Sequence, residues 1–284
     1  MNLFKSTLLL TLMTLLLLFV GRYFGGQNGM LMALIFAGGM NFVAYFFSDK
    51  IALAANRAKP VTRDELPRVY RIVEGLTQRN NMPMPRIYVT PDPSPNAFAT
   101  GRNPQHSAVA VTEGILNILD DEELEGVLAH ELGHVQNRDI LTSSIAATLA
   151  GAITWLAHIG RWGMIFGGYG GDRDRERSGG GIGALFMFIL APIAATLVQL
   201  WVSRTREYEA DATGAAMTHN PYALARALQK IHAYSQRVPT IASPSMAHMY
   251  INAPQLRGAD FAELFSTHPP MQKRIQRLIG RDTI

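Results

Sequence analysis

Four stretches of the chain lack charged residues and are long enough to span a hydrocarbon core of about 30 Å. We expect the first to be an uncleaved membrane anchor rather than a secretory signal, because a second apolar stretch follows at once and no A-x-A-like cleavage site separates them. The third contains several Thr and Ser side chains, so a buried helix is its alternative. The four stretches are residues 7–20, residues within 26–48, the segment between Asp139 and Arg161, and the segment between Arg177 and Arg204.

Four spans would place the N-terminus and both long polar segments on one side of the membrane. Nearly all Lys and Arg residues lie in those parts; the exceptions are Arg22, Arg161, Arg173, Arg175 and Arg177. The positive-inside rule then predicts that the polar segments face the cytoplasm. The chain would divide into a two-helix membrane anchor (1–48), a first polar part (49–139), a transmembrane hairpin (140–203) with a Gly-rich turn, and a second polar part (204–284).

The polar parts are predicted to be mostly α-helical with a small β-sheet. Apolar residues at helical spacing and acidic or Pro residues at helix starts predict the helices, and partly alternating β-branched runs predict the strands. The residues between the two strands, 91–105, are rich in Pro, Asn and Gly and are expected to form turns. The predicted helices cover 64–79, 120–138 and 221–236, and the predicted strands cover RIYVT (86–90) and SAVAVT (107–112).

Composition agrees with a membrane protein that carries a sizeable polar domain. Of the 284 residues, 48% are hydrophobic and 17% are charged, whereas soluble domains carry about 25% charged residues. The absence of Cys excludes disulfides, Cys-ligated zinc and a thiol nucleophile. The net charge of +4 is explained by membrane orientation, and no zinc-finger or RNA-binding signature is present, so we expect no nucleic-acid partner.

The sequence HELGH (130–134) lies inside the predicted helix 120–138. His130 and His134 are four residues apart, so both imidazoles project from one face of the helix and can bind one Zn²⁺. Glu131 is placed beside them to accept a proton from the water that zinc activates. The alternative is a pair of surface histidines on an ordinary helix.

A catalytic zinc needs a third protein ligand and an open fourth position. Residue 140 is Ile, so the metzincin extension with a third His is absent. The acidic segment that follows the fourth apolar stretch offers Glu207 and Asp211, four apart on an expected helix, as ligand and supporting carboxylate. Glu209 is another candidate ligand, but it would point to the opposite side of that helix. The alternative to a ligand role is that this segment is simply a solvent-exposed acidic helix end.

The expected spans bring these two helices together. The HELGH helix would end at Asp139, where the third span begins, and the helix of Glu207 would start where the fourth span ends. A hairpin of spans places both ends on one membrane side. If the first helix continued unbroken, about 14 Å of helix would separate His130 from Asp139, which predicts a zinc site close to the lipid surface.

These residues resemble the HtpX family of membrane zinc metalloproteases, which is related to the type-I CAAX prenyl protease. The resemblance covers the whole chain and implies four membrane helices with a gluzincin-like zinc peptidase domain in the bacterial inner membrane. It implies that His130, His134 and Glu207 bind one Zn²⁺ per chain and that Glu131 is the general base. Asp211 would be the supporting carboxylate of the family's E-x-x-x-D pattern.

Two further segments resemble family motifs. NAFATG (96–101) is similar to the family's edge-strand region, which implies that Asn96 contacts the substrate backbone. HPPMQKR (268–274) is similar to an H-P-P-x-x-x-R motif, which implies that His268 and Arg274 bind substrate or the developing oxyanion. Without the resemblance, the first segment could be a turn and His268 a residue at a helix entry.

We therefore expect a zinc endopeptidase that cleaves membrane or misfolded proteins at the cytoplasmic face. The family resemblance adds a role in membrane-protein quality control under stress. The expected partners are the lipid bilayer, protein or peptide substrates, and other membrane quality-control proteases. One alternative is a non-enzymatic scaffold or chaperone with a structural zinc, which would need a fourth protein ligand such as His268 or Asp211. Another is a prenyl-peptide protease, which differs only in substrate.

Overall fold

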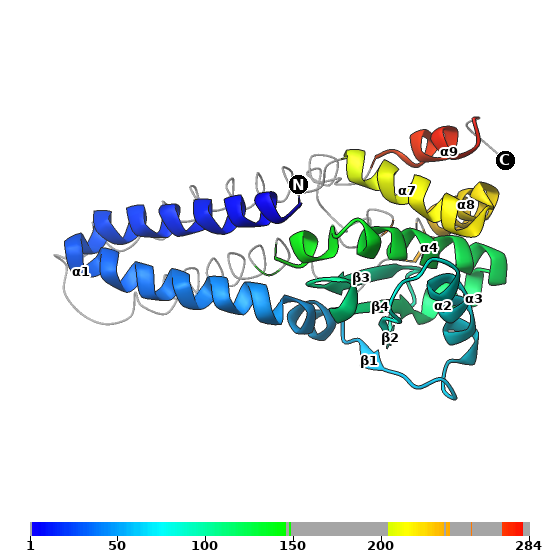
Figure 1. The fold of residues 1–284 in the computed structure, drawn as a ribbon, viewed down its shortest axis with the longest axis horizontal. Coiled ribbons are helices and arrows are strands. Elements are labelled where there is room, and N and C mark those ends of the chain that lie inside the picture. Colours follow the sequence, from blue (N-terminus) through cyan, green and yellow to red (C-terminus); the bar gives the residue numbers. More distant parts are fainter. Residues whose placement is uncertain are drawn as a thin grey trace.

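The structure is a computed structural model that describes residues 2–145, 148, 204–235, 237–238, 251 and 269–280. Most of the third expected span lies outside the described residues. So do the fourth expected span, the Gly-rich turn and His268. The described elements form a helical hairpin and a helix-rich domain with a small sheet (Figure 1).

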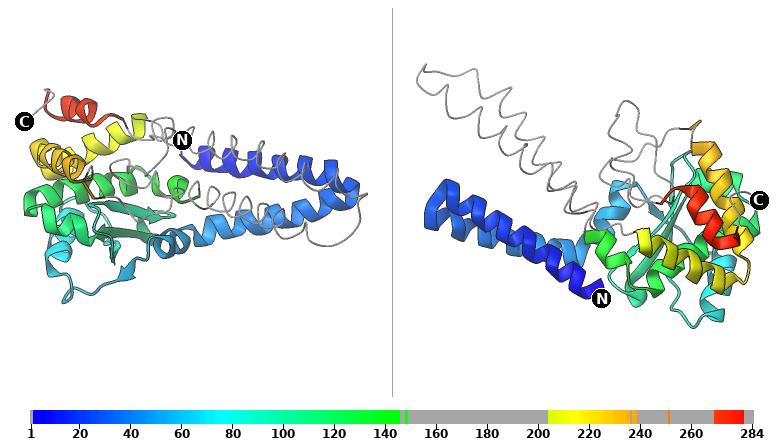
Figure 2. Two further views of the ribbon diagram at one scale, coloured as in Figure 1. Left: turned by 180° about the vertical axis from the view of Figure 1, so that it is seen from behind. Right: turned by 90° about the horizontal axis from the view of Figure 1, so that it is seen from above.

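The hairpin is a single chain segment, α1 (Asn2–Ala55), that turns back at Gly26 (φ 57°, ψ −140°). Its two arms lie side by side (Figure 1 and the left view of Figure 2) and contain the first two expected spans. Asn41 Nδ2 donates a hydrogen bond to Thr14 Oγ1 across the arms at 2.9 Å. Of the described helices, the arm Gly25–Ala55 is long and apolar enough to cross a membrane.

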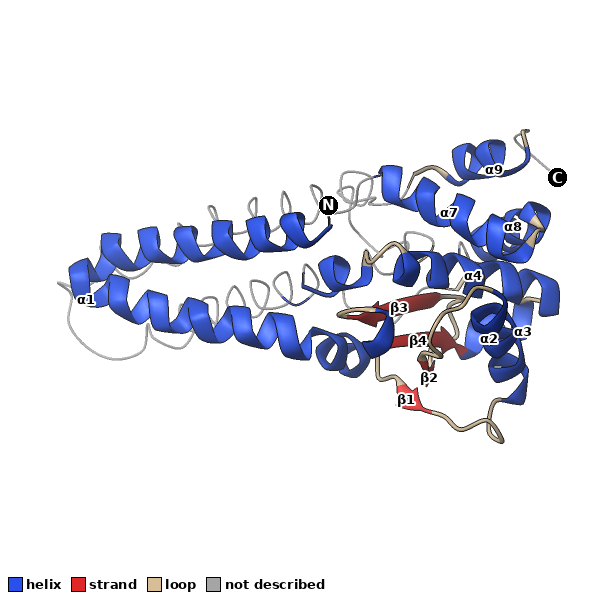
Figure 3. Ribbon diagram, in the orientation of Figure 1, coloured by secondary structure: helices blue, strands red, loops and turns tan. Residues whose placement is uncertain are grey.

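The sheet has four strands in the order β1-β2-β4-β3, with β3 on an edge (Figure 3). Strands β2 and β4 are parallel, whereas β3 is antiparallel to β4 and β1 is antiparallel to β2. The two predicted strands are confirmed as β2 and β4. The turn residues expected in 91–105 flank a third strand, since the run AFATG pairs with β4, where the family resemblance implied an edge-strand region. The strands are β1 (Lys59–Pro60), β2 (Arg86–Thr90), β3 (Ala97–Gly101) and β4 (Ser107–Thr112).

The three helices predicted in the polar parts are present with shifted ends, and the short helix α3 was not predicted. A capping box starts α4: Asp120 accepts from the Glu123 N–H, and the Glu123 carboxylate accepts from the Asp120 N–H. The described helices of this domain are α2 (Pro67–Arg79), α3 (Glu113–Ile118), α4 (Asp121–Gln136), α7 (Arg204–Thr218), α8 (Pro221–Ser235) and α9 (Met271–Ile279).

Helix α4 is the centre of the core. It packs against β3 and α2 on one side and against α7 and α8 on the other (Figure 1). Its apolar side chains Val127, Leu128 and Leu132 are fully buried. Because α4 is enclosed by the sheet and by α7, the HELGH residues are held between an edge strand and a second helix rather than presented on the surface.

The HELGH helix, predicted to cover 120–138 and to end at Asp139, ends two residues earlier than predicted. The helix ends at Gln136, and Arg138 adopts a left-handed conformation with φ 58°. At this turn the N–H of Asp139 donates a hydrogen bond to the carbonyl of His134 at 2.9 Å, so Asp139 lies against the end of α4. A new helical segment begins at Ile140.

Candidate metal centre

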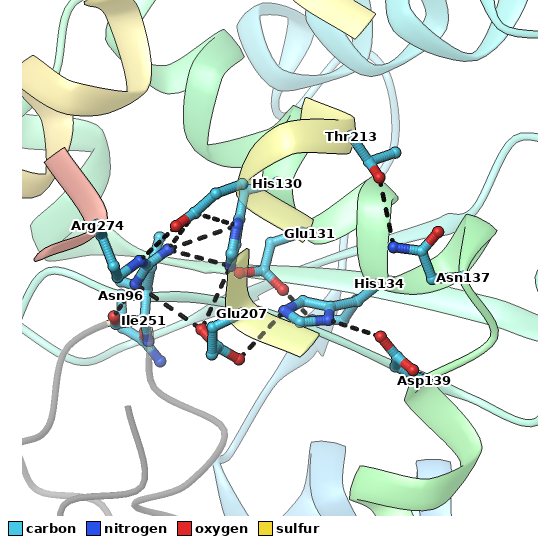
Figure 4. Close-up of polar contacts among 12 residues, drawn as sticks. Asn96, His130, Glu131, His134, Asn137, Asp139, Glu207, Thr213, Ile251 and Arg274 are labelled. Atoms are coloured by element: carbon cyan, nitrogen blue, oxygen red, sulfur yellow. Dashed lines mark hydrogen bonds and ion pairs between the residues drawn. The ribbon is translucent and has the colours of Figure 1, made fainter. Parts of the chain in front are cut away.

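Three side chains from two helices converge at one point: His130 and His134 from α4 and Glu207 from α7 (Figure 4). Glu207 Oε2 is 3.8 Å from His130 Nε2, and Glu207 Oε1 is 3.5 Å from His134 Nε2. A tetrahedral zinc site with bonds of about 2.1 Å holds its ligand atoms about 3.4 Å apart. Two imidazole nitrogens and a carboxylate oxygen at this spacing therefore fit a zinc ion.

Helical geometry decides which acidic residue of α7 faces α4. Glu207 is 5% exposed and reaches both imidazoles, whereas Glu209 points away and is exposed. Asp211, one turn further along, is 2% exposed and faces His130. Glu207, the carboxylate predicted from its spacing on the helix, is therefore the one that the fold places beside the two histidines.

Each imidazole presents Nε2 to Glu207 and is held by a carboxylate at Nδ1. Asp211 Oδ1 is 2.9 Å from His130 Nδ1. Asp139 Oδ2 is 3.4 Å from His134 Nδ1 (Figure 4). Asp211 therefore lies behind the ring of His130. Sequence reasoning missed Asp139 as part of this site, since its place beside His134 depends on the left-handed turn at Arg138.

Arg274 from α9 is a buried cation beside these carboxylates, with an exposed fraction of 1%. Its Nε and Nη2 donate to the two oxygens of Asp211 at 2.9 and 2.6 Å, and Nη1 lies 3.8 Å from Glu207 Oε2. Burial alone would raise the pKa of Asp211, but the Arg274 guanidinium and the hydrogen bond with His130 lower it to about 2. Asp211 is thus a permanent anion at neutral pH.

The two histidines differ in how the protein environment affects their protonation. Burial lowers the pKa of His130 to about 4, against the opposing hydrogen bond with Asp211. Burial also disfavours protonation of His134, but the hydrogen bond with Asp139 and the charges of Glu207 and Glu131 outweigh it and raise its pKa. A neutral imidazole is the form that binds a metal, so His130 is ready as a ligand at neutral pH.

Glu131 lies beside the cluster and is held by the edge strand. Its Oε2 accepts a hydrogen bond from the Ala99 N–H of β3 at 2.9 Å, and the residue is 5% exposed. Burial raises the pKa of Glu131 to about 7, with Glu207 acting in the same direction and His134 against it. A carboxyl group with a pKa near neutrality can both accept and return a proton at physiological pH.

Asn96 precedes β3 and is fully buried. Its Oδ1 accepts from the N–H of Ile251 at 2.9 Å, and the carbonyl of Ile251 accepts from Arg274 Nη1 at 3.0 Å. Among the described residues, Asn96 Nδ2 has no hydrogen-bond partner. Asn96 and Arg274 thus both bind a peptide backbone at the edge of the cluster, here that of Ile251. No sequence signal indicated that Ile251 lies at this site.

The fold and the His–His–Glu cluster together define a metal-dependent peptidase built on an H-E-x-x-H helix. The model of peptidase family M48 matches residues 64–282, and the chain belongs to this family. The match includes the cluster and Arg274.

Relatives over nearly the full length agree. The chain is 56% identical over 279 residues to a protein named Protease HtpX homolog from Desulfatibacillum aliphaticivorans, covering 98% of this chain and 89% of that protein. A protein of the same name from Aquifex aeolicus is 55% identical over 267 residues, covering 93% of this chain and 87% of that protein. The expected resemblance to the HtpX family is confirmed, and the chain is a metalloprotease.

A solved structure shares the fold. The crystal structure of S. mikatae Ste24p has a TM-score of 0.55 and 20% sequence identity, and the match covers 98% of this chain and 65% of that chain. At this identity the likeness concerns the fold alone. The apolar arm Gly25–Ala55 indicates that this metalloprotease is attached to a membrane.

Proposed function

We propose that this metalloprotease is a zinc endopeptidase that cleaves membrane or misfolded proteins at the cytoplasmic face of the inner membrane, as part of membrane-protein quality control. The observation that carries the proposal is the convergence of the His130, His134 and Glu207 ligand atoms, all within 4.8 Å of one another, beside a buried Glu131. One Zn²⁺ per chain would be held by those three residues. When bound, it would supply a Lewis acid that polarises the scissile carbonyl and acidifies a water molecule.

Glu131 is the proposed general base. Its carboxylate would take the proton of the attacking water and deliver it to the amine that leaves. The hydrogen bond from Ala99 fixes one carboxylate oxygen, so the proton would move at the other oxygen, Oε1. Asp211 and Arg274 would keep the imidazole of His130 oriented while the reaction proceeds.

The edge strand β3 is the proposed peptide-binding element. Because the Ala99 N–H points away from β4 to Glu131, the backbone groups of Ala97 point to the same side. A substrate strand could pair there. Asn96, whose Nδ2 has no hydrogen-bond partner in the described part of the chain, and Arg274 would bind the substrate backbone. Their hydrogen bonds to the backbone of Ile251 support this role. We also propose that His268 binds substrate, and this proposal rests only on its position in the H-P-P motif.

A scaffold with a structural zinc is less well supported. It would need a fourth protein ligand, and Asp211 is committed to His130 Nδ1 and Arg274 behind the ring. No observation favours a prenylated peptide over other substrates. We therefore retain hydrolysis of unmodified protein chains as the proposal.

The central test uses the full-length protein purified in detergent, with an unfolded protein such as casein as substrate. Glu131→Gln should retain one zinc per chain, measured by mass spectrometry of the metal, yet lose proteolysis, because it removes only the base. His134→Ala should lose the zinc as well. His106→Ala, which removes an exposed imidazole outside the cluster, is the matched control and should retain both. Cleavage by the Glu131→Gln protein would refute the mechanism.

Two measurements in cells test the remaining parts. Proteins that accumulate in membranes with the Glu131→Gln variant but not with the parent would be substrates, and other proteases that copurify would be partners. The chain has no Cys, so single introduced thiols report topology. Gln105→Cys should be shielded from an impermeant thiol reagent in spheroplasts, whereas Ser178→Cys should react. The reverse labelling pattern would contradict four spans with a cytoplasmic site.

A further inference from the structure

Asp139 lies against His134 through both its backbone and its side chain. Its N–H donates to the carbonyl of His134 at 2.9 Å, and its Oδ2 is 3.4 Å from His134 Nδ1. On a continuous helix, a residue five positions later is rotated by about 140° and cannot meet the earlier side chain. The contact therefore depends on the break after Gln136.

The break is made by an unusual backbone conformation. Arg138 has φ 58°, a left-handed conformation that is unfavourable for residues other than glycine. Such conformations persist where the surrounding structure holds them, and they cluster at functional sites. At this position the conformation places the Asp139 carboxylate against His134 of α4.

The carboxylate of Asp139 is buried, with an exposed fraction of 2%, and a buried charge needs a partner. Arg206 of α7 supplies positive charge nearby. It is 6% exposed, and within the described part of the chain its Nε and Nη1 have no hydrogen-bond partner. Burial lowers the pKa of Arg206, and the charges of Asp139, Glu207 and Glu209 oppose that shift.

The pairing of imidazole and carboxylate is the same at both histidines. His130 is followed outward by Asp211, which accepts two hydrogen bonds from the buried Arg274. His134 is followed by Asp139, and the charge of the buried Arg206 interacts with that of Asp139. At both histidines the imidazole Nε2 faces Glu207, and the carboxylate lies at Nδ1.

We propose that Asp139 is a positioning residue of the metal centre, which accepts a hydrogen bond from His134 Nδ1–H and so directs the Nε2 lone pair at the metal, with Arg206 as its charge partner. The inference rests on the proposed function. Carboxylates that hold metal-binding imidazoles fix the tautomer and the ring orientation, and their removal lowers metal affinity by about 10–100-fold. A purely structural Asp139 would affect folding but not the intrinsic metal affinity of the folded protein.

The test measures metal binding by the full-length protein in detergent, by competition for Zn²⁺ with a chromophoric chelator and by the visible absorption of Co²⁺ in the site. Asp139→Ala should weaken Zn²⁺ binding by about 10–100-fold and shift the Co²⁺ bands. Asp139→Asn, whose amide oxygen can still accept the hydrogen bond, should restore most of the affinity. If the Ala variant does not fold, the Asn variant still decides the point, since Zn²⁺ binding by folded Asp139→Asn that is weakened by about 10-fold or more would refute the role as hydrogen-bond acceptor. Asn137→Ala, in the same turn but bonded to Thr213 of α7, should match the parent.

The outcomes separate this inference from the function on which it rests. If the parent binds Zn²⁺ and His134→Ala abolishes binding, but both Asp139 variants bind Zn²⁺ and Co²⁺ as the parent does, the role of Asp139 is refuted and the zinc site stands. If the parent does not bind Zn²⁺ through His134, both the proposed function and the role of Asp139 are refuted.

Discussion

Gly214 of α7 lies directly against the backbone of His130 in α4. A Cβ atom at Gly214 would be 2.8 Å from His130 N and 3.0 Å from His130 Cα, closer than real side chains approach. Gly133 of α4 makes the reciprocal approach, where a Cβ would be 3.0 Å from the carbonyl oxygen of Ala210. The two glycines set the separation of the helices that carry His130, His134 and Glu207, so the geometry of the cluster depends on them.

Gly214→Ala should therefore disturb the cluster. The added methyl group would push α7 away from α4 and separate Glu207 from the imidazoles. We expect a loss of about 1–3 kcal/mol in the free energy of unfolding, as for other overpacked cores, and a reduced zinc content of the folded protein. Thermal unfolding and metal analysis of the purified protein measure both effects.

Gly75 provides the matched control, since it lies inside α2 and a Cβ there meets nothing within 4 Å. Gly75→Ala should stabilise the protein by about 0.5–1 kcal/mol, because alanine has the higher helix propensity, and should leave the zinc content unchanged. Equal zinc content in both variants would show that the close helix crossing does not hold the cluster.

Glu207 and Glu209 form a natural pair for testing the third ligand. They are two residues apart on α7, but only Glu207 is buried against His130 and His134. Glu207→Gln should lower zinc affinity by at least about 10-fold, because a neutral amide is a far weaker ligand for zinc than a carboxylate. Glu209→Gln should bind zinc as the parent does. Isothermal titration of the two variants decides the point, and a larger effect at Glu209 would overturn the assignment.

Several elements of this fold could be predicted because short sequence patterns specify them. Strands β2 and β4 have β-branched alternation, α4 has a capping box, and α8 begins with Pro221, so each was predictable without its neighbours. Glu207 was predictable because helical periodicity and the expected hairpin of spans both point to it. Apart from the hairpin of spans, these features depend on residues within a few positions of one another.

The elements that were missed depend on tertiary context. Strand β3 was indicated only by the family resemblance of NAFATG, because the run AFATG contains a single β-branched residue and is stabilised by β4 and α4. The turn at Arg138 is equally hidden, because arginine has no preference for φ 58°. Asp139 was therefore interpreted as the end of the HELGH helix and the start of the third span, and its contact with His134 was missed.

Arg274 should be required for the stability of the folded protein as well as for binding of the substrate backbone. Removing its charge by Arg274→Met would leave the buried carboxylate of Asp211 without its counterion, which typically costs about 3–5 kcal/mol. Arg274→Lys keeps the charge but loses the two parallel bonds to Asp211, so we expect an intermediate loss. Lys273→Met, at the exposed neighbouring position, should change stability by less than about 0.5 kcal/mol. Unfolding measurements that rank Lys273→Met as the most harmful would contradict this account.

Glu131 should impose a pH dependence on the stability of the metal-free protein. Its pKa is raised from 4.5 to about 7 in the folded state. Between these values the unfolded chain releases the proton while the folded protein retains it, so stability falls as pH rises through this window and levels off above pH 7. Glu131→Gln cannot titrate. The variant should therefore gain stability relative to the parent from pH 4.5 to 7, by on the order of 3 kcal/mol at most.

The comparison of variant with parent is necessary because His130 acts in the opposite direction. Its pKa is lowered to about 4, so His130 contributes stability that increases as pH rises from about 4 to 6.5. This contribution is common to both proteins and largely cancels in their difference. Thermal unfolding of both, stripped of metal in detergent at pH 4.5 to 8, gives that difference, with the exposed Glu209→Gln as a control that should show no comparable trend. A difference that shrinks with rising pH would mean that the folded protein favours the ionised form of Glu131, and that burial does not govern the proposed base.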